Sequence, residues 1–221
     1  MEALAQPHWE ALPPKVAEVL QNLARATSLE PFYLAGGTAL ALRLGHRISV
    51  DLDFFGPVET FDDVWRHRMI QDFGAHFSIE VPQNSPLGLV LGIEGVDVGF
   101  YTYGYEMLDP LNRLVDVPIA GIADIGLMKL DAIADRGRRK DFVDLYFIAQ
   151  RVTLEQLLSL SKEKYPYDRY FVIRSLEALV EFDVADAESD LRMLVPTDWE
   201  EVKRFFVEET VRLGKKWIKP K

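Results

Sequence analysis

Two aspartates inside an apolar stretch have the clearest chemical potential in this sequence. Asp51 and Asp53 lie within ISVDLDFF, which reads as a strand, and alternate residues of a strand share a face. Two neighbouring carboxylates repel each other unless a proton or a cation relieves the repulsion. Mg²⁺ takes oxygen ligands, usually one or two carboxylates together with substrate phosphates. The pattern predicts a site for Mg²⁺ or Mn²⁺, and the alternative is a solvated strand face.

The strand reading also assigns the neighbours of the aspartates to two faces. Ser49 is expected on the polar face, beside Asp51 and Asp53. The residues expected to point into the core are Ile48, Val50, Leu52 and Phe54.

A Gly-Gly-Thr turn precedes the aspartates, and such a turn is typical of an anion-binding site. The stretch FYLAGG reads as a short strand, and TALALRLGH reads as a helix that begins with Thr38 as its N-cap. Backbone N–H groups at a helix N-terminus bind phosphate, and glycines such as Gly36 and Gly37 let the backbone approach closely. The sequence therefore predicts a phosphate site and a metal site linked by one short helix.

Composition narrows the class of protein. The chain has 221 residues and no cysteine, which excludes disulfides and thiolate chemistry. Its net charge of −10 disfavours indiscriminate binding to nucleic-acid phosphates. The four histidines show no zinc-hydrolase spacing. No secretory signal and no membrane-spanning apolar run are evident, so we expect no membrane partner and a cytoplasmic location.

The first half of the chain mixes helices and strands. A helix is expected at 14–26, with an apolar stripe, and a second at 61–73, behind a capping box of Thr60 and Asp63. The expected strands are 77–81, 89–93 and 96–103, the last two joined by a hairpin turn at Glu94-Gly95.

The second half reads as almost all helix. Asp124 is expected to cap a helix that stops at Gly137, and 139–150 continues as the next helix. Two further capping boxes are expected, Thr153 with Gln156 and Thr197 with Glu200. The predicted fold is α+β: a mixed sheet flanked by helices at 1–120, followed by a C-terminal helical bundle at 121–221 packed against it.

The motifs together resemble a known family. GGTALALRLGHRISVDLDFF resembles the signature of the nucleotidyltransferase superfamily with a DNA polymerase beta-like fold. More closely, GGTAL, R-x-S-x-DLDFF and a later K…R-x-x-x-KD-x-x-DL resemble the AbiEii/AbiGii toxin family of abortive-infection and type IV toxin–antitoxin systems. The resemblance spans roughly residues 33–55 and 124–148. The later motif consists of Lys129, Arg136, Lys140, Asp141, Asp144 and Leu145.

The resemblance implies roles for the first block. Asp51 and Asp53 would hold the metal between the phosphates of a nucleoside triphosphate, and the Thr38 hydroxyl would contact a phosphate. The nucleotide-binding set expected here is Gly36, Gly37, Thr38 and Ser49.

The resemblance also implies a third carboxylate on a neighbouring strand, which activates the attacking hydroxyl. The candidate is Asp97, which would share a strand face with Gly99 and Tyr101. The alternative is an ordinary hairpin residue beside the Glu94-Gly95 turn.

The later block suggests phosphate neutralisation. Lys129 lies in an apolar segment and needs an anionic partner, for which a triphosphate would serve; the alternative is a surface lysine. Asp141 and Asp144 share a helix face and would tether Lys129 or Arg136, complete the site, or form a salt bridge between two helices. Arg136 and Lys140 join the expected nucleotide-binding set, whereas Arg43 and Arg47 are weaker candidates whose default place is the solvated surface.

The resulting expectation is a metal-dependent nucleotidyltransferase that moves a nucleotide from a nucleoside triphosphate to an acceptor hydroxyl. The resemblance implies a toxin with RNA, in particular transfer RNA, as acceptor, and an antitoxin protein or its gene as partner. The basic run Arg136, Arg138, Arg139 and Lys140 supports an RNA acceptor. Two alternatives remain: transfer to a small molecule such as an aminoglycoside or lincosamide, and a non-catalytic scaffold of the same fold that binds protein.

Overall fold

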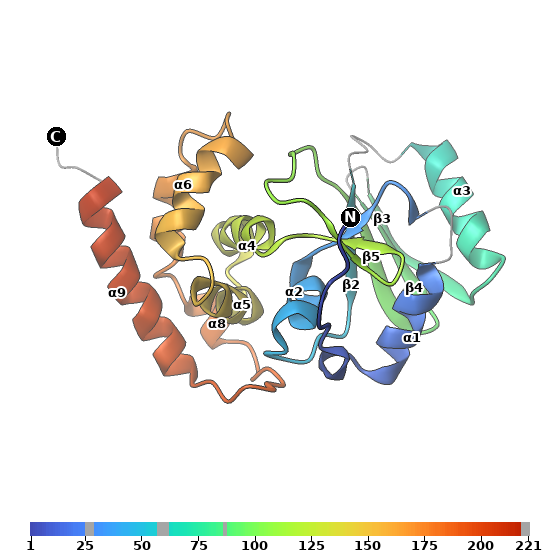
Figure 1. The fold of residues 1–221 in the computed structure, drawn as a ribbon, viewed down its shortest axis with the longest axis horizontal. Helices are drawn as coiled ribbons and strands as arrows, with labels where there is room; N and C mark the ends of the chain where they lie inside the picture. Colours follow the sequence, from blue (N-terminus) through green and yellow to red (C-terminus); the bar gives the residue numbers. More distant parts are fainter. Residues whose placement is uncertain (25–28, 57–61, 86–87, 218–221) are drawn as a thin grey trace. The chain divides into compact units, whose positions relative to one another are not determined.

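A computed structural model describes residues 1–24, 29–56, 62–85 and 88–217 (Figure 1). The chain forms two compact units. Unit 1 comprises Met1–Glu106 and Pro110–Ala120, and unit 2 comprises Met107–Asp109 and Gly121–Lys221. No helix in the described residues is long and apolar enough to cross a membrane.

Unit 1 is built on a seven-stranded mixed sheet in the order β3-β4-β5-β2-β1-β7-β6. Two neighbouring pairs are parallel, β2 with β5 and β1 with β7, and the other pairs are antiparallel. The mixed sheet confirms the predicted α+β class. The strands are β1 Tyr33–Leu34, β2 Leu52–Gly56, β3 Ile79–Ser85, β4 Gly88–Ile93, β5 Val96–Thr102, β6 Asn112–Leu114 and β7 Val117–Ile119.

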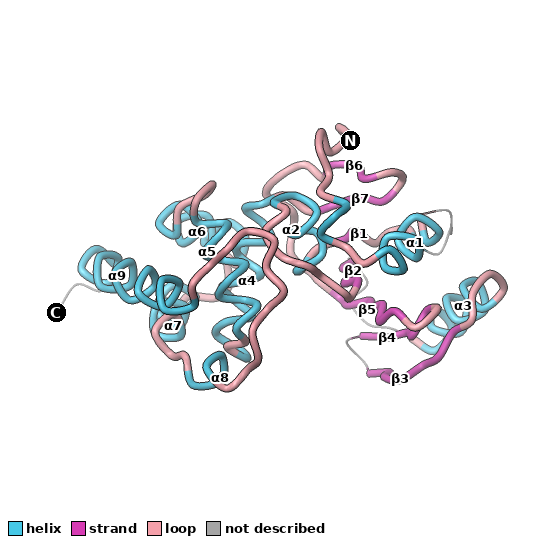
Figure 2. Tube along the Cα trace, turned by 90° about the horizontal axis from the view of Figure 1, so that it is seen from below, coloured by secondary structure: helices cyan, strands magenta, loops and turns pink. Residues whose placement is uncertain are grey.

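Helices cover both faces of this sheet. Helices α1 and α3 lie on one face and α2 on the other (Figure 2). The α1/α3 face is held by aromatic packing: Phe100 of β5 contacts Phe54 of β2 at 5.4 Å and Phe73 of α3 at 5.6 Å between ring centroids. The helical segments of unit 1 are the 3₁₀ helix Trp9–Ala11, α1 Pro14–Leu23, α2 Gly36–Leu44 and α3 Asp63–Gly74.

Several predicted features of unit 1 are confirmed. Helix α1 buries the predicted apolar stripe of Val16, Val19, Leu20 and Leu23, although it ends at Leu23 and residues 25–28 lie outside the described part. Strands β4 and β5 form a hairpin in which Ile93 pairs with Val96. Glu94 and Gly95 adopt φ angles of 52° and 79°, the left-handed conformation that a two-residue type I′ turn requires.

The strand expected at 48–55 is wrong in its first half. Strand β2 begins only at Leu52, and Val50, predicted in the core, is 59% exposed, whereas Ser49 is 2% exposed. The reason is that residues before Leu52 form a loop. The Ser49 N–H donates to the Ala11 carbonyl (2.9 Å) and turns the Ser49 side chain inward.

Two predicted helix starts in unit 1 are also wrong. Helix α2 begins at Gly36 with Ala35 as N-cap, so Thr38 lies inside the first turn and its hydroxyl bonds elsewhere. Helix α3 begins at Asp63, and its cap is the Asp62 carboxylate, which accepts from the Trp65 N–H (2.7 Å). Asp62 fits this position because it precedes the first helical residue; Thr60 lies outside the described residues.

The named secondary-structure elements of unit 2 are all helices within the described residues, as predicted. Gly137 ends α4 with a left-handed φ of 56°, and Thr153 and Gln156 form the predicted capping box. The box expected at Thr197 is replaced by Asp198, whose carboxylate accepts from the Glu200 N–H (3.1 Å). The helices are α4 Ile122–Arg136, α5 Arg139–Ala149, α6 Leu154–Lys164, α7 Phe171–Ala178, α8 Asp183–Asp186 and α9 Trp199–Trp217.

Asp124 was expected to cap α4, but Gly121 occupies that position. The Asp124 carboxylate is fully buried and accepts from the backbone N–H groups of Leu108 (3.1 Å) and Asp109 (3.0 Å) and from Lys164 Nζ (2.6 Å). Burial of a charged pair is tolerated only when hydrogen bonds complete it. Asp124 therefore fixes the 107–109 segment and α6 to α4.

This geometry predicts that Lys164→Met destabilises unit 2. The substitution leaves a buried carboxylate without its cation, which costs about 3–5 kcal/mol. Urea unfolding followed by circular dichroism measures the loss. Lys215→Met, an exposed position on α9, is the control and should unfold like the wild type. Equal stability of the two variants would contradict the structural role of the pair.

Candidate active site

The first turn of α2 closes tightly on strand β2 in unit 1. The Ala35 N–H donates to the Asp53 carbonyl (3.0 Å), and Gly36 follows with a left-handed φ of 64°. A Cβ atom at position 36 would lie 2.9 Å from Asp53 Oδ2. Both the conformation and the space therefore require glycine, so that the helix N-terminus and the Asp53 carboxylate can lie side by side.

A buried hydroxyl network links this turn to Asp51. Thr38 Oγ1 and Ser49 Oγ lie 2.8 Å apart, and both side chains are buried. The Thr38 hydroxyl also donates to the Asp51 carbonyl, and Ser49 Oγ lies 3.4 Å from Asp51 Oδ1. The structure thus brings together six predicted site residues within unit 1: Gly36, Gly37, Thr38, Ser49, Asp51 and Asp53.

Arg47 is part of this network and was wrongly expected on the solvated surface. It is 4% exposed, and Nη1 donates to the Ile48 carbonyl (3.0 Å) and to Ser49 Oγ (3.5 Å). The sequence signal that could have indicated a buried Arg47 is its alternation with Ser49 and Asp51 in R-x-S-x-D. Arg43 is half-buried rather than fully exposed, and its Nε donates to the Ala120 carbonyl (2.7 Å).

Asp97 lies one strand away from the aspartate pair. Strand β5 runs parallel to β2 with Asp53 opposite Gly99, and Asp51 and Asp97 each directly precede the first paired residues, Leu52 and Val98. The predicted alternation is present: Asp97 is exposed while Val96, Val98 and Phe100 are buried. Partners in neighbouring strands point to the same face, so Asp97 is placed on the face of Asp53. Its catalytic role remains a prediction.

The carboxylates suit a metal that is shared with substrate phosphates. Among the described residues, no three or more histidine, aspartate or glutamate side chains gather closely enough to hold a metal ion by themselves. Mg²⁺ needs only one or two protein carboxylates when phosphates supply further ligands. Gly36 leaves open the space beside Asp53 Oδ2 that any larger residue would fill. Asp51 and Asp53 therefore fit the expected metal with a triphosphate.

The second predicted block forms a buried charge cluster within unit 2. Lys129 Nζ lies 2.9 Å from Asp141 Oδ1 and 2.6 Å from Asp144 Oδ2, and all three side chains are at most 5% exposed. Arg136 makes a bidentate contact with Asp141, through Nε (2.9 Å) and Nη2 (3.0 Å). The salt-bridge alternative for the two aspartates is thus present between α4 and α5. Lys140 in the first turn of α5 is half-buried.

The cluster changes the acidity of Asp141. Burial alone would raise the pKa of this carboxyl, but the charges and hydrogen bonds of Lys129 and Arg136 together hold its pKa below the ordinary value. Asp141 is therefore a carboxylate at neutral pH, and it neutralises positive charge that the fold has buried.

The basic run that supported an RNA acceptor is largely neutralised by acidic partners. Arg138 Nε lies 2.6 Å from Glu188 Oε1, and Arg139 Nη1 lies 2.5 Å from Asp190 Oδ1. Arg139 also donates to the Ala185 carbonyl (2.9 Å) and is almost buried. These side chains hold the α8 region against α5, so the run is weaker support for RNA binding than the sequence indicated.

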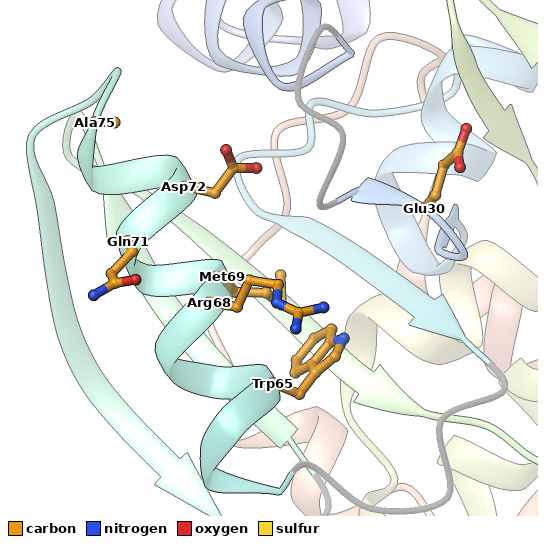
Figure 3. A pocket seen from close by; sticks show the side chains of 7 residues that line it. All are labelled: Glu30, Trp65, Arg68, Met69, Gln71, Asp72 and Ala75. Atoms are coloured by element: carbon orange, nitrogen blue, oxygen red, sulfur yellow. The ribbon is translucent and has the colours of Figure 1, made fainter.

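Unit 1 also has a hollow of about 570 Å³, and none of its lining side chains, which Figure 3 draws, belongs to the candidate site. Trp65 in its wall packs on Phe32 at 5.2 Å, and Phe32 packs on Phe100 at 5.4 Å. Phe100 points to the face opposite Asp97, so the hollow lies on the α3 side of the sheet. It is lined by Glu30, Trp65, Arg68, Met69, Gln71, Asp72 and Ala75.

The buried cluster predicts that Lys129→Met destabilises unit 2. Two buried carboxylates lose their common partner, which costs about 3–5 kcal/mol. Melting temperature and activity are measured on the same preparation, with exposed Lys162→Met as the control. If Lys129 also serves the triphosphate, activity per folded molecule falls by roughly two orders of magnitude, or about 2.7 kcal/mol. Normal activity per folded molecule would leave Lys129 a structural role alone.

Asp141 predicts a specific loss of stability in acid. A carboxyl whose folded pKa is lowered stabilises the fold above its unfolded pKa of about 3.9, and this contribution is lost as pH falls through the lower folded value. The stability difference between wild type and Asp141→Asn should therefore be constant near neutrality and shrink below about pH 4. Urea unfolding of both proteins from pH 7 to pH 3 tests this; a constant difference would contradict it.

A family model and a relative each match most of this chain. The family model described as nucleotidyl transferase AbiEii toxin, type IV TA system, matches residues 18–212. The uncharacterized protein aq_aa25 of Aquifex aeolicus is 36% identical over 194 residues, covering 86% of this chain and 91% of that protein.

Solved structures are similar at lower identity. The nucleotidyltransferase toxin MenT4 of Mycobacterium tuberculosis has a TM-score of 0.55 at 18% identity, covering 89% of this chain and 83% of MenT4, which shows a shared fold. JHP933 of Helicobacter pylori has a TM-score of 0.49 at 19% identity, covering 93% and 94%. The family match over most of the chain confirms the resemblance seen in the motifs. The chain belongs to the AbiEii family of type IV toxin–antitoxin systems and is a nucleotidyltransferase.

Proposed function

We propose that this nucleotidyltransferase moves a nucleotide from a nucleoside triphosphate to an acceptor hydroxyl with Mg²⁺ or Mn²⁺ as cofactor. One observation carries the proposal: the first turn of α2 lies against Asp53, with glycine where a Cβ would lie 2.9 Å from the carboxylate. A helix N-terminus favours phosphate, and a carboxylate beside it would repel that phosphate unless a cation lay between them.

In this proposal the site residues of unit 1 have separate roles in nucleotide transfer. The backbone at Gly36 and Gly37 and the hydroxyl of Thr38 would bind triphosphate oxygens, and Asp51 and Asp53 would hold the metal. When bound, the metal supplies neutralisation of phosphate charge. Asp97 would accept the proton of the acceptor hydroxyl. The hydroxyl oxygen bonds to the α-phosphorus, the bond from that phosphorus to the bridging oxygen breaks, and pyrophosphate leaves.

In unit 2 the proposed nucleotide-binding residues form a charge cluster of their own. In this proposal Asp141 and Asp144 orient Lys129, whose ammonium neutralises charge on the triphosphate. Arg136, which is bound to Asp141, and Lys140 would contribute further positive charge. Ser49 would support the metal ligand Asp51 through the Thr38 hydroxyl, which donates to the Asp51 carbonyl.

For the acceptor we propose RNA, with transfer RNA as the leading candidate, and a role as a toxin opposed by an antitoxin. Family membership supports the toxin role, and the cytoplasm supplies both nucleoside triphosphates and RNA. A small cationic acceptor such as an aminoglycoside is the second candidate. The net charge of −10 and the acidic partners of Arg138 and Arg139 favour it. A protein-binding scaffold is the remaining alternative.

A labelling experiment separates these candidates. The purified protein is incubated with each α-labelled nucleoside triphosphate, Mg²⁺, and either total RNA or an aminoglycoside panel. Label in an RNA band supports the RNA acceptor, and label on a small molecule supports the second candidate. Absence of transfer and of nucleotide binding supports the scaffold.

The metal assignment predicts that Asp51→Asn with Asp53→Asn abolishes Mg²⁺-dependent nucleotide binding. Calorimetry should show nucleotide binding by the wild type with Mg²⁺ and none by the double variant, because the carboxylates are the metal's protein ligands. The variant should fold at least as well as the wild type, since two repelling carboxylates are gone. Asp116→Asn, an exposed loop position, is the control. Undiminished binding by the double variant would refute the site.

A further inference from the structure

Arg47 places a buried cation at the first turn of α2. Its guanidinium lies against Gly37 in the first turn of α2, and the side chain is only 4% exposed. The N-terminal end of a helix carries partial positive charge, so a cation there is unfavourable. Burial adds a desolvation cost. The dipole of α2 therefore does not account for this arginine, and its hydrogen bonds to the Ile48 carbonyl and to Ser49 Oγ lead toward the neighbouring site.

The hydrogen-bond donors in this region form a directed chain. Arginine can only donate and a carbonyl oxygen can only accept. Because the single Thr38 proton goes to the Asp51 carbonyl, the proton between Thr38 and Ser49, whose oxygens lie 2.8 Å apart, comes from Ser49. Ser49 Oγ in turn accepts from Arg47 Nη1 (3.5 Å). The chain thus runs from Arg47 through two hydroxyls to the backbone of a proposed metal ligand.

Gly37 is the counterpart of Arg47. Unlike Gly36, it does not adopt a left-handed φ, so its backbone conformation is open to any residue. A Cβ at position 37 would nevertheless lie 2.4 Å from Arg47 Nη2 and 3.4 Å from Ser49 Oγ. Alanine is favoured over glycine in a helix by its intrinsic propensity. The glycine is therefore explained by the space that the guanidinium needs.

We propose that Arg47 is a positioning residue whose fit against Gly37 sets the orientation of Asp51 through Ser49 and Thr38. This inference rests on the proposed function, because Asp51 is taken there as a metal ligand. It adds a requirement that the metal and phosphate residues alone do not impose: a cation beneath the helix N-terminus, and a residue without a side chain at position 37.

A double-mutant cycle tests the proposal with Gly37→Ala, Arg47→Gln and the combined variant. Glutamine ends near the position of the arginine Nε, short of Cζ, which would lie 3.5 Å from the new methyl. The alanine should therefore harm the wild type but fit the Arg47→Gln background. Each single variant should lower kcat at least tenfold and raise the Mg²⁺ concentration for half-maximal activity. The combined variant should match Arg47→Gln within about twofold in both.

Matched variants separate positioning from general damage. Gly104→Ala, at a glycine with nothing within 4 Å of its added Cβ, and Arg113→Gln, at an exposed arginine, should leave both quantities unchanged. Arg47→Lys restores a charge near Cζ and should recover part of the loss. If Arg47 is merely structural, the variants lower the melting temperature, while kcat per folded molecule and the Mg²⁺ requirement stay at wild-type values; that result overturns the proposal.

The cycle also distinguishes this inference from the proposed function. If the wild type transfers nucleotides and the effects of Gly37→Ala and Arg47→Gln on kcat multiply independently, the inference alone is overturned. A wild type that neither transfers nor binds a nucleoside triphosphate with Mg²⁺ overturns the proposed function, and the positioning role falls with it. Non-additive loss in kcat and Mg²⁺ requirement, with folded fractions equal by circular dichroism, supports both.

Discussion

The close approach of the α2 first turn to Asp53 is the constraint on which the candidate site depends. The Ala35 N–H is held by the Asp53 carbonyl, and Gly36 follows in the left-handed conformation with no room for a Cβ beside the carboxylate. Backbone pairing thus fixes the distance between a helix N-terminus, which attracts anions, and a carboxylate, which repels them. In the proposed function a bound cation with its own phosphate ligands would resolve this opposition, whereas a larger residue at position 36 would prevent the approach altogether.

In unit 2 the fold depends on buried charges that are neutralised in place. Lys129 lies between two aspartates, and Lys164 contacts Asp124, all with at most 5% exposure. Such pairs gain little stability over apolar residues, but removing one partner is strongly destabilising. They join helices, α4 to α5 through Lys129 and α4 to α6 through Lys164. An acidic chain can bury lysines in this way because carboxylates are plentiful.

The sequence predicted the fold class, the hairpin and the glycine turn because each rests on a local signal: strand alternation, a two-residue Glu-Gly turn, and a motif. It failed where a distant partner decides. Val50 was assigned to the core because alternation cannot show that Ala11 holds Ser49 and keeps this segment out of the sheet. Arg138 and Arg139 read as a basic patch because their acidic partners lie about fifty residues later in the chain. Asp124 was read as a cap because its three donors are not local.

The loop before β2 explains why R-x-S-x-D-x-D contains two kinds of residue, Arg47 and Ser49 first and then the two aspartates. In a continuous strand, Arg47 and Ser49 would stand in line with Asp51 and Asp53 on one flat face. In the observed loop, Arg47 and Ser49 turn beneath the first turn of α2, while Val50 points to solvent. Only Asp53 belongs to the regular strand, and Asp51 directly precedes it. The motif therefore has two parts. Arg47 and Ser49 lie against the first turn of α2, whereas Asp51 and Asp53 lie at the start of β2, which begins at Leu52.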